Sequence, residues 1–141
     1  LGRQPRLAGV KHLNRLENVL ARAEWQDPVI FEGLLCDASG WLVGGTMSNL
    51  FWVTQGILHT PELDQCGVAG VARARLLRAA DRLGIPVRLG HWPPEALQAA
   101  DEVLICNSLM GVRRVAMLDA TPLPQAGWRA RLDEALHETP D

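Results

Sequence analysis

The sequence has almost no lysine: Lys11 is the only one, although lysine and arginine together number 14. An arginine guanidinium stays protonated at any working pH, whereas a lysine amine can lose its charge on burial and serve as a nucleophile or base. Any lysine chemistry in this chain therefore falls to Lys11. The alternative interpretation is that an arginine-rich composition has left one lysine on the surface.

Cysteine is also scarce. Cys36, Cys66 and Cys106 are odd in number and lack the CxxC spacing of redox and zinc sites. We therefore expect buried free thiols in a reducing compartment, the cytoplasm. The four histidines are equally scattered along the chain, so the sequence predicts no metal site.

An excess of charge of one sign and a long hydrophobic run are both missing. The net charge of -2 gives no reason to expect nucleic acid or an anionic membrane as partner. The longest weakly charged stretch, residues 33–62, is interrupted by Asp37 and several glycines, which excludes a membrane-spanning helix. Nothing at the amino end resembles a signal peptide. With 141 residues, 48% of them apolar, the chain reads as one soluble globular domain.

Apolar residues recur at helical spacing in three places. The first is an amphipathic pattern over about residues 12–25, which begins just after Lys11 and is ended by Asp27-Pro28. The second covers about residues 71–83, where Gly84 is placed to cap the helix, and the third covers residues 128–137. A short helix with proline in its first turn is predicted for residues 94–100.

Short apolar runs separated by turn residues predict the strands. Four of them follow one another closely and indicate an antiparallel meander, for which one irregular loop is the alternative: residues 29–36, 41–43, 50–53 and 57–60. Three more are expected further on, at residues 86–89, 102–106 and 112–118. Helices and strands in this mixture predict a single α+β domain.

Four blocks of sequence resemble a known enzyme family. They read LAGVKHLNRLENVL, GWLVGGTMSNLFWV, LDQCGVAGVARARLL and ADEVLICNSLMGVRRV, in that order. Together they are similar to the fold-type IV pyridoxal phosphate enzymes, and within these most similar to the 4-amino-4-deoxychorismate lyases, which form 4-aminobenzoate and pyruvate in folate biosynthesis. The resemblance implies the fold of the large domain of the D-amino acid aminotransferase-like enzymes, and pyridoxal 5'-phosphate as cofactor.

The resemblance also has implications for the organisation of the chain. In the family the cofactor-binding lysine follows a smaller amino-terminal domain, which supplies an arginine for the cofactor phosphate. Here the matching lysine is residue 11, so residues 1–141 are expected to form the single carboxy-terminal, cofactor-binding domain, with the small domain absent. Full-length members of the family are expected to be homodimers whose small-molecule substrate is aminodeoxychorismate.

The resemblance assigns Lys11 as the catalytic residue, which both holds the cofactor aldehyde and moves a proton. A lysine in this role must be neutral, and we expect burial between Val10 and Leu13 to achieve this. By the same matching, Asn49 of the SNLF block belongs to the cofactor site.

A phosphate cradle is expected at residues 67–73. Two glycines three apart, directly before a helix, let backbone amides approach an anion at the positive helix end, although GxxG alone is also typical of a plain turn. The resemblance assigns the amides of Val71 and Ala72 to the phosphate, with Asn107 and Ser108 as further polar contacts. Ordinary turn chemistry is the alternative for Asn107 and Ser108.

One expected residue is missing. In the family a glutamate five residues before the asparagine of the SNLF block pairs with the cofactor's ring nitrogen, and counting back from Asn49 reaches Gly44. Gly44 is thus the cofactor-site position at which the family's carboxylate is absent. A hairpin around residues 37–40 would bring Glu32 close to Gly45, and Glu32 is one hypothesis for a substitute acid. A salt bridge or solvent exposure is the alternative for Glu32.

Two other functions remain open. An aminotransferase of the same fold type, for D-amino or branched-chain substrates, would share most of these motifs. A non-catalytic remnant is favoured by Gly44 and by the absence of the small domain. Arg113 and Arg114 are candidate ligands for substrate carboxylates, but neighbouring residues of a strand point to opposite sides, so at most one of them faces a site, and a solvated pair is the alternative.

Overall fold

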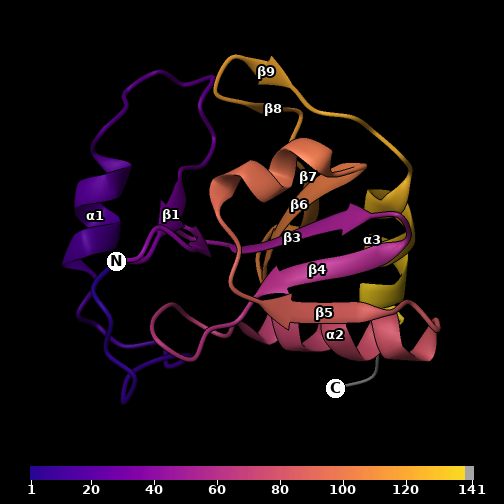
Figure 1. The fold of residues 1–141 in the computed structure, drawn as a ribbon, viewed down its shortest axis with the longest axis horizontal. Coiled ribbons are helices and arrows are strands. Elements are labelled where there is room, and N and C mark those ends of the chain that lie inside the picture. The colour runs from indigo at the N-terminus through magenta and orange to yellow at the C-terminus, as the bar shows by residue number, and fades with distance from the viewer. Residues whose placement is uncertain (139–141) are drawn as a thin grey trace.

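The structure is a computed structural model, and it describes residues 1–138. A five-stranded sheet in the order β5-β4-β3-β6-β7 forms its centre (Figure 1), and two small two-stranded sheets, β1-β2 and β8-β9, flank it. In chain order the elements are α1 (Leu16–Arg22), β1 (Leu34–Cys36), β2 (Leu42–Gly45), β3 (Asn49–Thr54), β4 (Ile57–Pro61), α2 (Val71–Arg82), β5 (Val87–Gly90), η1 (Pro94–Ala99), β6 (Glu102–Asn107), β7 (Gly111–Arg114), β8 (Met117–Leu118), β9 (Thr121–Pro122) and α3 (Trp128–His137).

Strand β3 is the middle of the central sheet. It pairs antiparallel with β4 on one side and with β6 on the other, and five of its six residues are buried. The turn to β4 places Gln55 and Gly56 at φ of 50° and 76°, the left-handed conformation that tight hairpin turns use. Because β3 is paired on both sides, its first residue, Asn49, has a well-defined position at the end of the central strand.

Apolar residues cover both faces of the sheet. On one face α2 and α3 pack against the strands through a cluster that includes Phe51, Leu76 and Leu132, each 0% exposed. On the other face η1 and β2 contribute Leu97 and Leu42 to a second cluster. Burying side chains of this size contributes roughly 1.5–3 kcal/mol each to the free energy of unfolding, so the sheet and its two covers form the stable body of the domain.

Much of the predicted secondary structure is confirmed. Helix α3 has the predicted bounds, α2 ends one residue early, and Gly84 follows α2 with a φ of 66° as its cap requires. The hairpin of β3 and β4 and the buried strand β6 are also present. The short helix predicted after Pro93 is a 3-10 helix.

Three predictions were wrong in part. The strand predicted over residues 29–36 begins only at Leu34, and β1 and β2 form a sheet separate from β3 and β4, so the expected meander is divided. The strand predicted over residues 112–118 is split into β7 and β8. The two predicted strands were too long because an apolar pattern also marks residues that pack without pairing, and a strand ends where its backbone has no partner strand.

Helix α1 differs most from its prediction, because it is short and has no buried residue. Its polar residues face the protein: the Glu17 carboxylate accepts the Gly2 amide at 2.7 Å, and Asn18 donates to the Thr46 carbonyl at 3.1 Å. Its apolar residues, Leu16, Val19 and Leu20, are 60% or more exposed. Figure 1 shows α1 at the left edge of the molecule, away from the central sheet. The predicted amphipathic pattern is present, but its apolar side faces outward.

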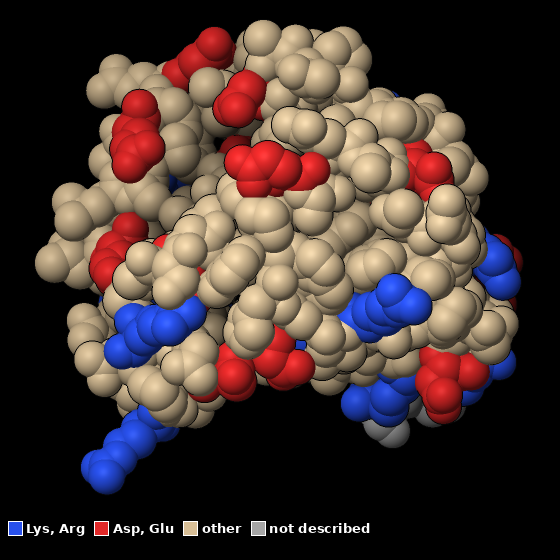
Figure 2. Space-filling view, viewed as in Figure 1, with Lys and Arg blue, Asp and Glu red and all other residues tan. Residues whose placement is uncertain are grey.

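On the face seen in Figure 2, acidic and basic side chains lie among uncharged ones, and both kinds are present in its lower part. Among the described residues, no helix has the length and apolar character needed to cross a membrane. Cys66 and Cys106 are buried free thiols as predicted, whereas Cys36 is only half-buried.

Candidate active site

The segment that carries Lys11 is fastened to the loop in front of α2. The Gly9 amide donates to the Gly67 carbonyl at 2.9 Å, and the Ala69 amide donates to the Gly9 carbonyl at 3.0 Å. These two bonds form a parallel bridge between Gly9 and Val68. Lys11 follows Gly9 by two residues, and Val71 follows Ala69 by two residues. The fold therefore brings together two of the four sequence blocks, which are distant along the chain.

The expected burial of Lys11 is wrong for the described chain. Lys11 is exposed, and its apolar neighbours do not shield it, because Val10 is 50% and Leu13 is 102% exposed. Apolar residues in sequence desolvate a lysine only when the fold packs them around it, and here they point into solvent. The backbone places Lys11 near the α2 loop, but the described residues leave its amine in water.

The start of α2 is open to an anion. Gly70 is the N-cap and offers no side-chain hydrogen bond, and the first turn contains no acidic residue. The first intrahelical bond runs from the Ala74 amide to the Gly70 carbonyl, so the amides of Val71 and Ala72 stand at the uncapped, positive end of a 12-residue helix. These are the two amides that the resemblance assigns to the cofactor phosphate.

Asn49 organises this helix start. Its Nδ2 donates to the Val68 carbonyl at 2.7 Å, and its Oδ1 accepts the Gly70 amide at 3.1 Å. A side chain at position 70 would collide with the Asn49 amide, with a Cβ only 2.5 Å from Oδ1. Asn49 is 9% exposed. Both ends of its amide are engaged by the loop, so its geometry supports holding the loop in shape rather than a direct contact with a ligand.

Asn107 and Ser108 lie opposite the start of α2. The Asn107 Oδ1 accepts the amides of Leu109 and Met110 at 2.9 Å each, and its Nδ2 donates to the Met47 carbonyl at 3.1 Å. Asn107 thus uses its polar atoms to shape the turn, as the turn alternative predicted, and leaves Ser108 exposed at the tip.

Four of the predicted cofactor residues line one groove of about 440 Å³, between the β6–β7 turn and the helices α2 and α3. These are Val71, Ala72, Asn107 and Ser108. The described fold therefore brings the predicted phosphate residues together, whereas Lys11, Asn49 and Gly44 do not line this groove.

Arg73 is the last residue of the expected phosphate cradle, and the sequence predicted no individual role for it. It lies one position beyond Ala72, is 8% exposed, and donates to the Pro61 carbonyl at 3.0 Å. Burial lowers the pKa of Arg73, and burial also raises the pKa of the neighbouring Cys106 thiol to about 12. An arginine on the otherwise apolar side of a predicted helix was the available signal. Its guanidinium ties α2 to the end of β4 and so fixes the start of the helix.

At Gly44 the fold leaves no room for the glutamate that the resemblance implies. A Cβ built on Gly44 would lie 2.9 Å from the Ser48 carbonyl oxygen. Backbone atoms yield less readily than side chains do, so a carboxylate at this position requires a different path for residues 46–48. The missing acid is thus accompanied by a backbone that excludes it.

Glu32 lies close to Gly45, as predicted: a Cβ on Gly45 would lie 2.6 Å from the Glu32 carboxyl carbon. The carboxylate accepts hydrogen bonds from Gly33, Thr46, Met47 and Ser48. With both oxygens engaged by the turn, Glu32 is poorly placed to serve a cofactor ring as well. The geometry therefore argues against Glu32 as the substitute for the missing acid.

The arginine pair is also accounted for. Arg113 is exposed, with its guanidinium 5.2 Å from the centre of the Phe31 ring, and Arg114 donates to the Leu123 carbonyl at 3.4 Å. Neither of them lines the groove. The solvated pair, rather than a ligand for carboxylates, is the interpretation that these contacts support.

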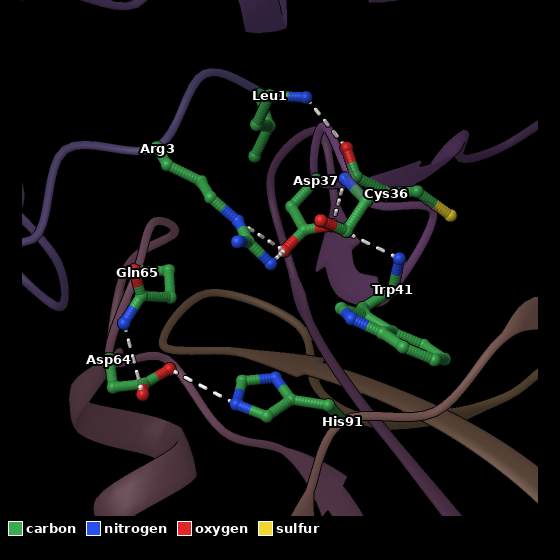
Figure 3. Close-up of polar contacts among 9 residues, drawn as sticks. Leu1, Arg3, Cys36, Asp37, Trp41, Asp64, Gln65 and His91 are labelled. Atoms are coloured by element: carbon green, nitrogen blue, oxygen red, sulfur yellow. Dashed lines mark hydrogen bonds and ion pairs between the residues drawn. The ribbon is translucent and has the colours of Figure 1, made fainter.

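A second tie fixes the amino-terminal segment. Arg3 donates to the Asp37 carboxylate at 2.8 Å (Figure 3), and the amides of Ser39 and Trp41 donate to the same carboxylate. Burial by itself would raise the pKa of Asp37, but the hydrogen bonds from Arg3 and from these two amides outweigh it and lower that pKa. The salt bridge connects the segment leading to Lys11 with the turn between β1 and β2.

Comparisons with known proteins show which family and fold this chain shares. An aminodeoxychorismate lyase of Vibrio harveyi is 41% identical over 120 residues, which cover 85% of this chain and 44% of the relative. A 4-amino-4-deoxychorismate lyase structure from Pseudomonas aeruginosa is 46% identical, with a TM-score of 0.93, and the match covers 98% of this chain and 51% of that one. A branched-chain amino acid aminotransferase structure from Escherichia coli has a TM-score of 0.81 at 28% identity, with 88% of this chain and 43% of that chain covered.

The chain thus spans about half the length of the relatives it matches. Its helices and strands follow the fold shared by these lyases and aminotransferases, which is the fold that the sequence predicted. Residues 2–118 match the family described as amino-transferase class IV. With that match covering most of the chain, the protein belongs to the class IV aminotransferase family.

Proposed function

We propose that this protein is a 4-amino-4-deoxychorismate lyase, a pyridoxal phosphate enzyme that acts in the cytoplasm and forms 4-aminobenzoate and pyruvate for folate biosynthesis. The observation that carries the proposal is the likeness to the Pseudomonas aeruginosa lyase, at 46% identity and a TM-score of 0.93. The described chain then corresponds to the larger, cofactor-binding domain, since it spans about half of that relative.

The residues of the groove fit the phosphate of this cofactor. The amides of Val71 and Ala72 are uncapped at a helix N-terminus, which favours an anion. Ser108 offers a hydroxyl on the facing turn of the same groove. Asn49 and Asn107 are proposed to hold the loop and the turn that carry these groups, in keeping with their hydrogen bonds.

Lys11 is the residue proposed to hold the cofactor covalently through Nζ. When bound, the cofactor supplies an electron sink for the substrate carbon that bears nitrogen. The Lys11 amine, once released, takes the proton from that carbon, and so acts as general base. Because the described residues leave Lys11 exposed, this role requires that another polypeptide surface cover it in the working enzyme.

The glycine at position 44 lowers the catalytic rate that we expect of this lyase. Removing one partner of a buried charged pair costs about 3 kcal/mol or more. If Gly44 leaves the ring nitrogen without its carboxylate, and the loss falls on the transition state, the reaction is slowed roughly a hundredfold. We therefore expect a slow lyase.

The assembly proposed is a homodimer. Its support is the outward apolar side of α1, where Leu16, Val19 and Leu20 are 60% or more exposed, together with Val29, which is 87% exposed. Exposed apolar residues gathered in one region mark surfaces that other polypeptides cover. Light scattering across a range of protein concentrations tests this, and a monomer at every concentration contradicts it.

The test of the function begins with Lys11. The protein is incubated with pyridoxal 5'-phosphate, reduced with borohydride, and mapped by peptide mass spectrometry. We expect the label on Lys11 and an absorption band at the blue edge of the visible, both absent in Lys11→Arg, which keeps the charge. Release of 4-aminobenzoate from 4-amino-4-deoxychorismate should also be abolished in Lys11→Arg. A wild-type protein that stays colourless and unlabelled contradicts the proposal and supports the non-catalytic remnant.

An aminotransferase is the second candidate, favoured by relatives such as the branched-chain-amino-acid aminotransferase of Escherichia coli, 31% identical over 106 residues. A keto acid acceptor distinguishes the two, because only an aminotransferase converts it into a new amino acid. We expect no amino acid product, and its appearance without 4-aminobenzoate would replace the lyase assignment.

A further inference from the structure

The turn formed by residues 46–48 is built around the carboxylate of Glu32. One oxygen accepts the amides of Gly33 and Thr46, each at 2.9 Å, together with the Thr46 hydroxyl. The other accepts the Ser48 hydroxyl at 2.8 Å and the Met47 amide at 3.2 Å. A carboxylate accepts at both oxygens, which matches five converging donors better than any neutral side chain does.

The residues of this turn are also the point where three parts of the proposed site meet. The Thr46 carbonyl accepts Asn18 Nδ2, from the helix that follows Lys11. The Met47 carbonyl accepts Asn107 Nδ2, from the turn that presents Ser108.

The third connection comes from Asn49, the next residue along. It binds Val68 and Gly70 in front of α2. Three positions within four consecutive residues, 46, 47 and 49, therefore each hold one arm of the site. The hydrogen bonds to the three arms are made by two backbone carbonyls and by the buried side-chain amide of Asn49. The positions of all these groups depend on the shape of the turn.

Glycine at position 45 is part of the same construction. A side chain there would collide with the Ser48 hydroxyl and lie 2.6 Å from the Glu32 carboxylate. The Gly45 amide donates to the Ser48 carbonyl at 2.8 Å and closes the turn. Carboxylate and turn are thus packed directly against each other, and a side chain at position 45 would push them apart.

We propose that Glu32 is a positioning residue of the cofactor site: by fixing residues 46–48, its carboxylate sets the spacing between the Lys11 segment, the Ser108 turn and the amides of Val71 and Ala72. The identity of the ligand rests on the proposed function. The geometric part does not, because it concerns how residues of this chain hold one another.

The first test needs no ligand. Amide signals of Val71, Ala72 and Ser108 are compared by NMR between the wild type and Glu32→Gln. The glutamine places an NH₂ group among donors, so the turn must rearrange, and we expect all three signals to move. The control is Glu24→Gln, an exposed residue of the same type, which should leave them in place. Unmoved signals in a folded Glu32→Gln protein overturn the proposal, whether or not the cofactor binds.

The second test uses three probes: pyridoxal 5'-phosphate, pyridoxal and inorganic phosphate. For Glu32→Gln we expect the dissociation constants of the two phosphate-bearing probes to rise about tenfold. A change of this size corresponds to the loss of roughly one hydrogen bond to the phosphate. Pyridoxal, which lacks the phosphate, should change less than twofold. An equal loss for pyridoxal would show that the effect does not act through the phosphate-binding amides, and would contradict the proposal.

Should Glu32→Gln not fold, the Ser48→Ala and Thr46→Val variants take its place. Each removes one side-chain donor and leaves the carboxylate bound to backbone amides. We expect a weakening of about threefold for the phosphate-bearing probes in each variant, and unchanged binding in both overturns the proposal. If the wild type shows no Lys11-dependent label but the NMR signals respond to Glu32→Gln, the proposed function fails while the positioning role stands.

Discussion

Helices α1 and α2 carry the same kind of apolar spacing and have opposite surroundings. In α2, Leu76, Ala79 and Ala80 are 0% exposed against the sheet, whereas in α1 Leu16 and Leu20 are 64% and 60% exposed. Helix α2 is therefore held by hydrophobic burial. The amino-terminal region, which carries the one lysine, is held instead by separate polar contacts such as Asn18 to Thr46 and Arg3 to Asp37. Apolar spacing identifies a helix, but it does not say whether the same chain supplies the surface that covers it.

The largest effect that tests this comparison is truncation of an apolar residue in each helix. Leu76→Ala should lower the free energy of unfolding by about 2–5 kcal/mol, because it leaves a cavity in the core. Leu20→Ala, the matched change in α1, should cost less than about 0.5 kcal/mol in the isolated chain. Urea unfolding measures both. Equal losses would mean that α1 is packed as firmly as α2.

The next test concerns a buried carboxylate that caps α3. Glu102 is 0% exposed, and its carboxylate accepts the amides of Ala126, Trp128 and Arg129 at the start of α3. Glu102→Ala leaves these donors without a partner and should cost about 1–3 kcal/mol. Glu134→Ala, an exposed position of the same helix, is the control, and thermal unfolding the measurement. A loss no greater than that of the control would show that α3 does not depend on this cap.

The smallest expected effect concerns the salt bridge between Arg3 and Asp37, which holds the amino-terminal segment. The pKa of Asp37 is lowered in the folded chain, so its contribution is present above the unfolded value near 3.9 and is lost as the pH falls through the folded value. Arg3 is 38% exposed, so the contribution should be about 1 kcal/mol or less. Hydrogen exchange of the Asp37 and Trp41 amides between pH 6 and pH 3 measures it. In Asp37→Asn the dependence should disappear, and its persistence would point to another group.

The sequence predicted the central sheet and its covering helices well because these elements pack against one another within the described chain. The pattern of residues 128–137 and the cap at Gly84 need only local spacing and a glycine. The boundaries of β1 could not be predicted, because they depend on which residues find a partner strand. The exposure of α1 was equally inaccessible, since it depends on a surface that the described residues do not supply.

For the candidate site, the groove residues came from motif resemblance, and the structure brings four of them together. The engagement of Asn49 and Asn107 by backbone groups was not predictable, because each partner is distant in sequence. The role of Glu32 was missed for the same reason: its five donors come from residues whose convergence only the folded turn reveals. Local patterns identify groups able to bind, and the tertiary structure decides what they bind.

The adjacent glycines at positions 44 and 45 bear on how such chains diversify. At position 44 a Cβ meets the Ser48 carbonyl, and at position 45 it meets the Ser48 hydroxyl and Glu32. A family member with a carboxylate at the first of these positions must carry its following turn along another path. Substitutions there should therefore be inherited together with changes at the three positions after the glycines. A single Gly44→Glu change in this background should be poorly tolerated until the turn has changed as well.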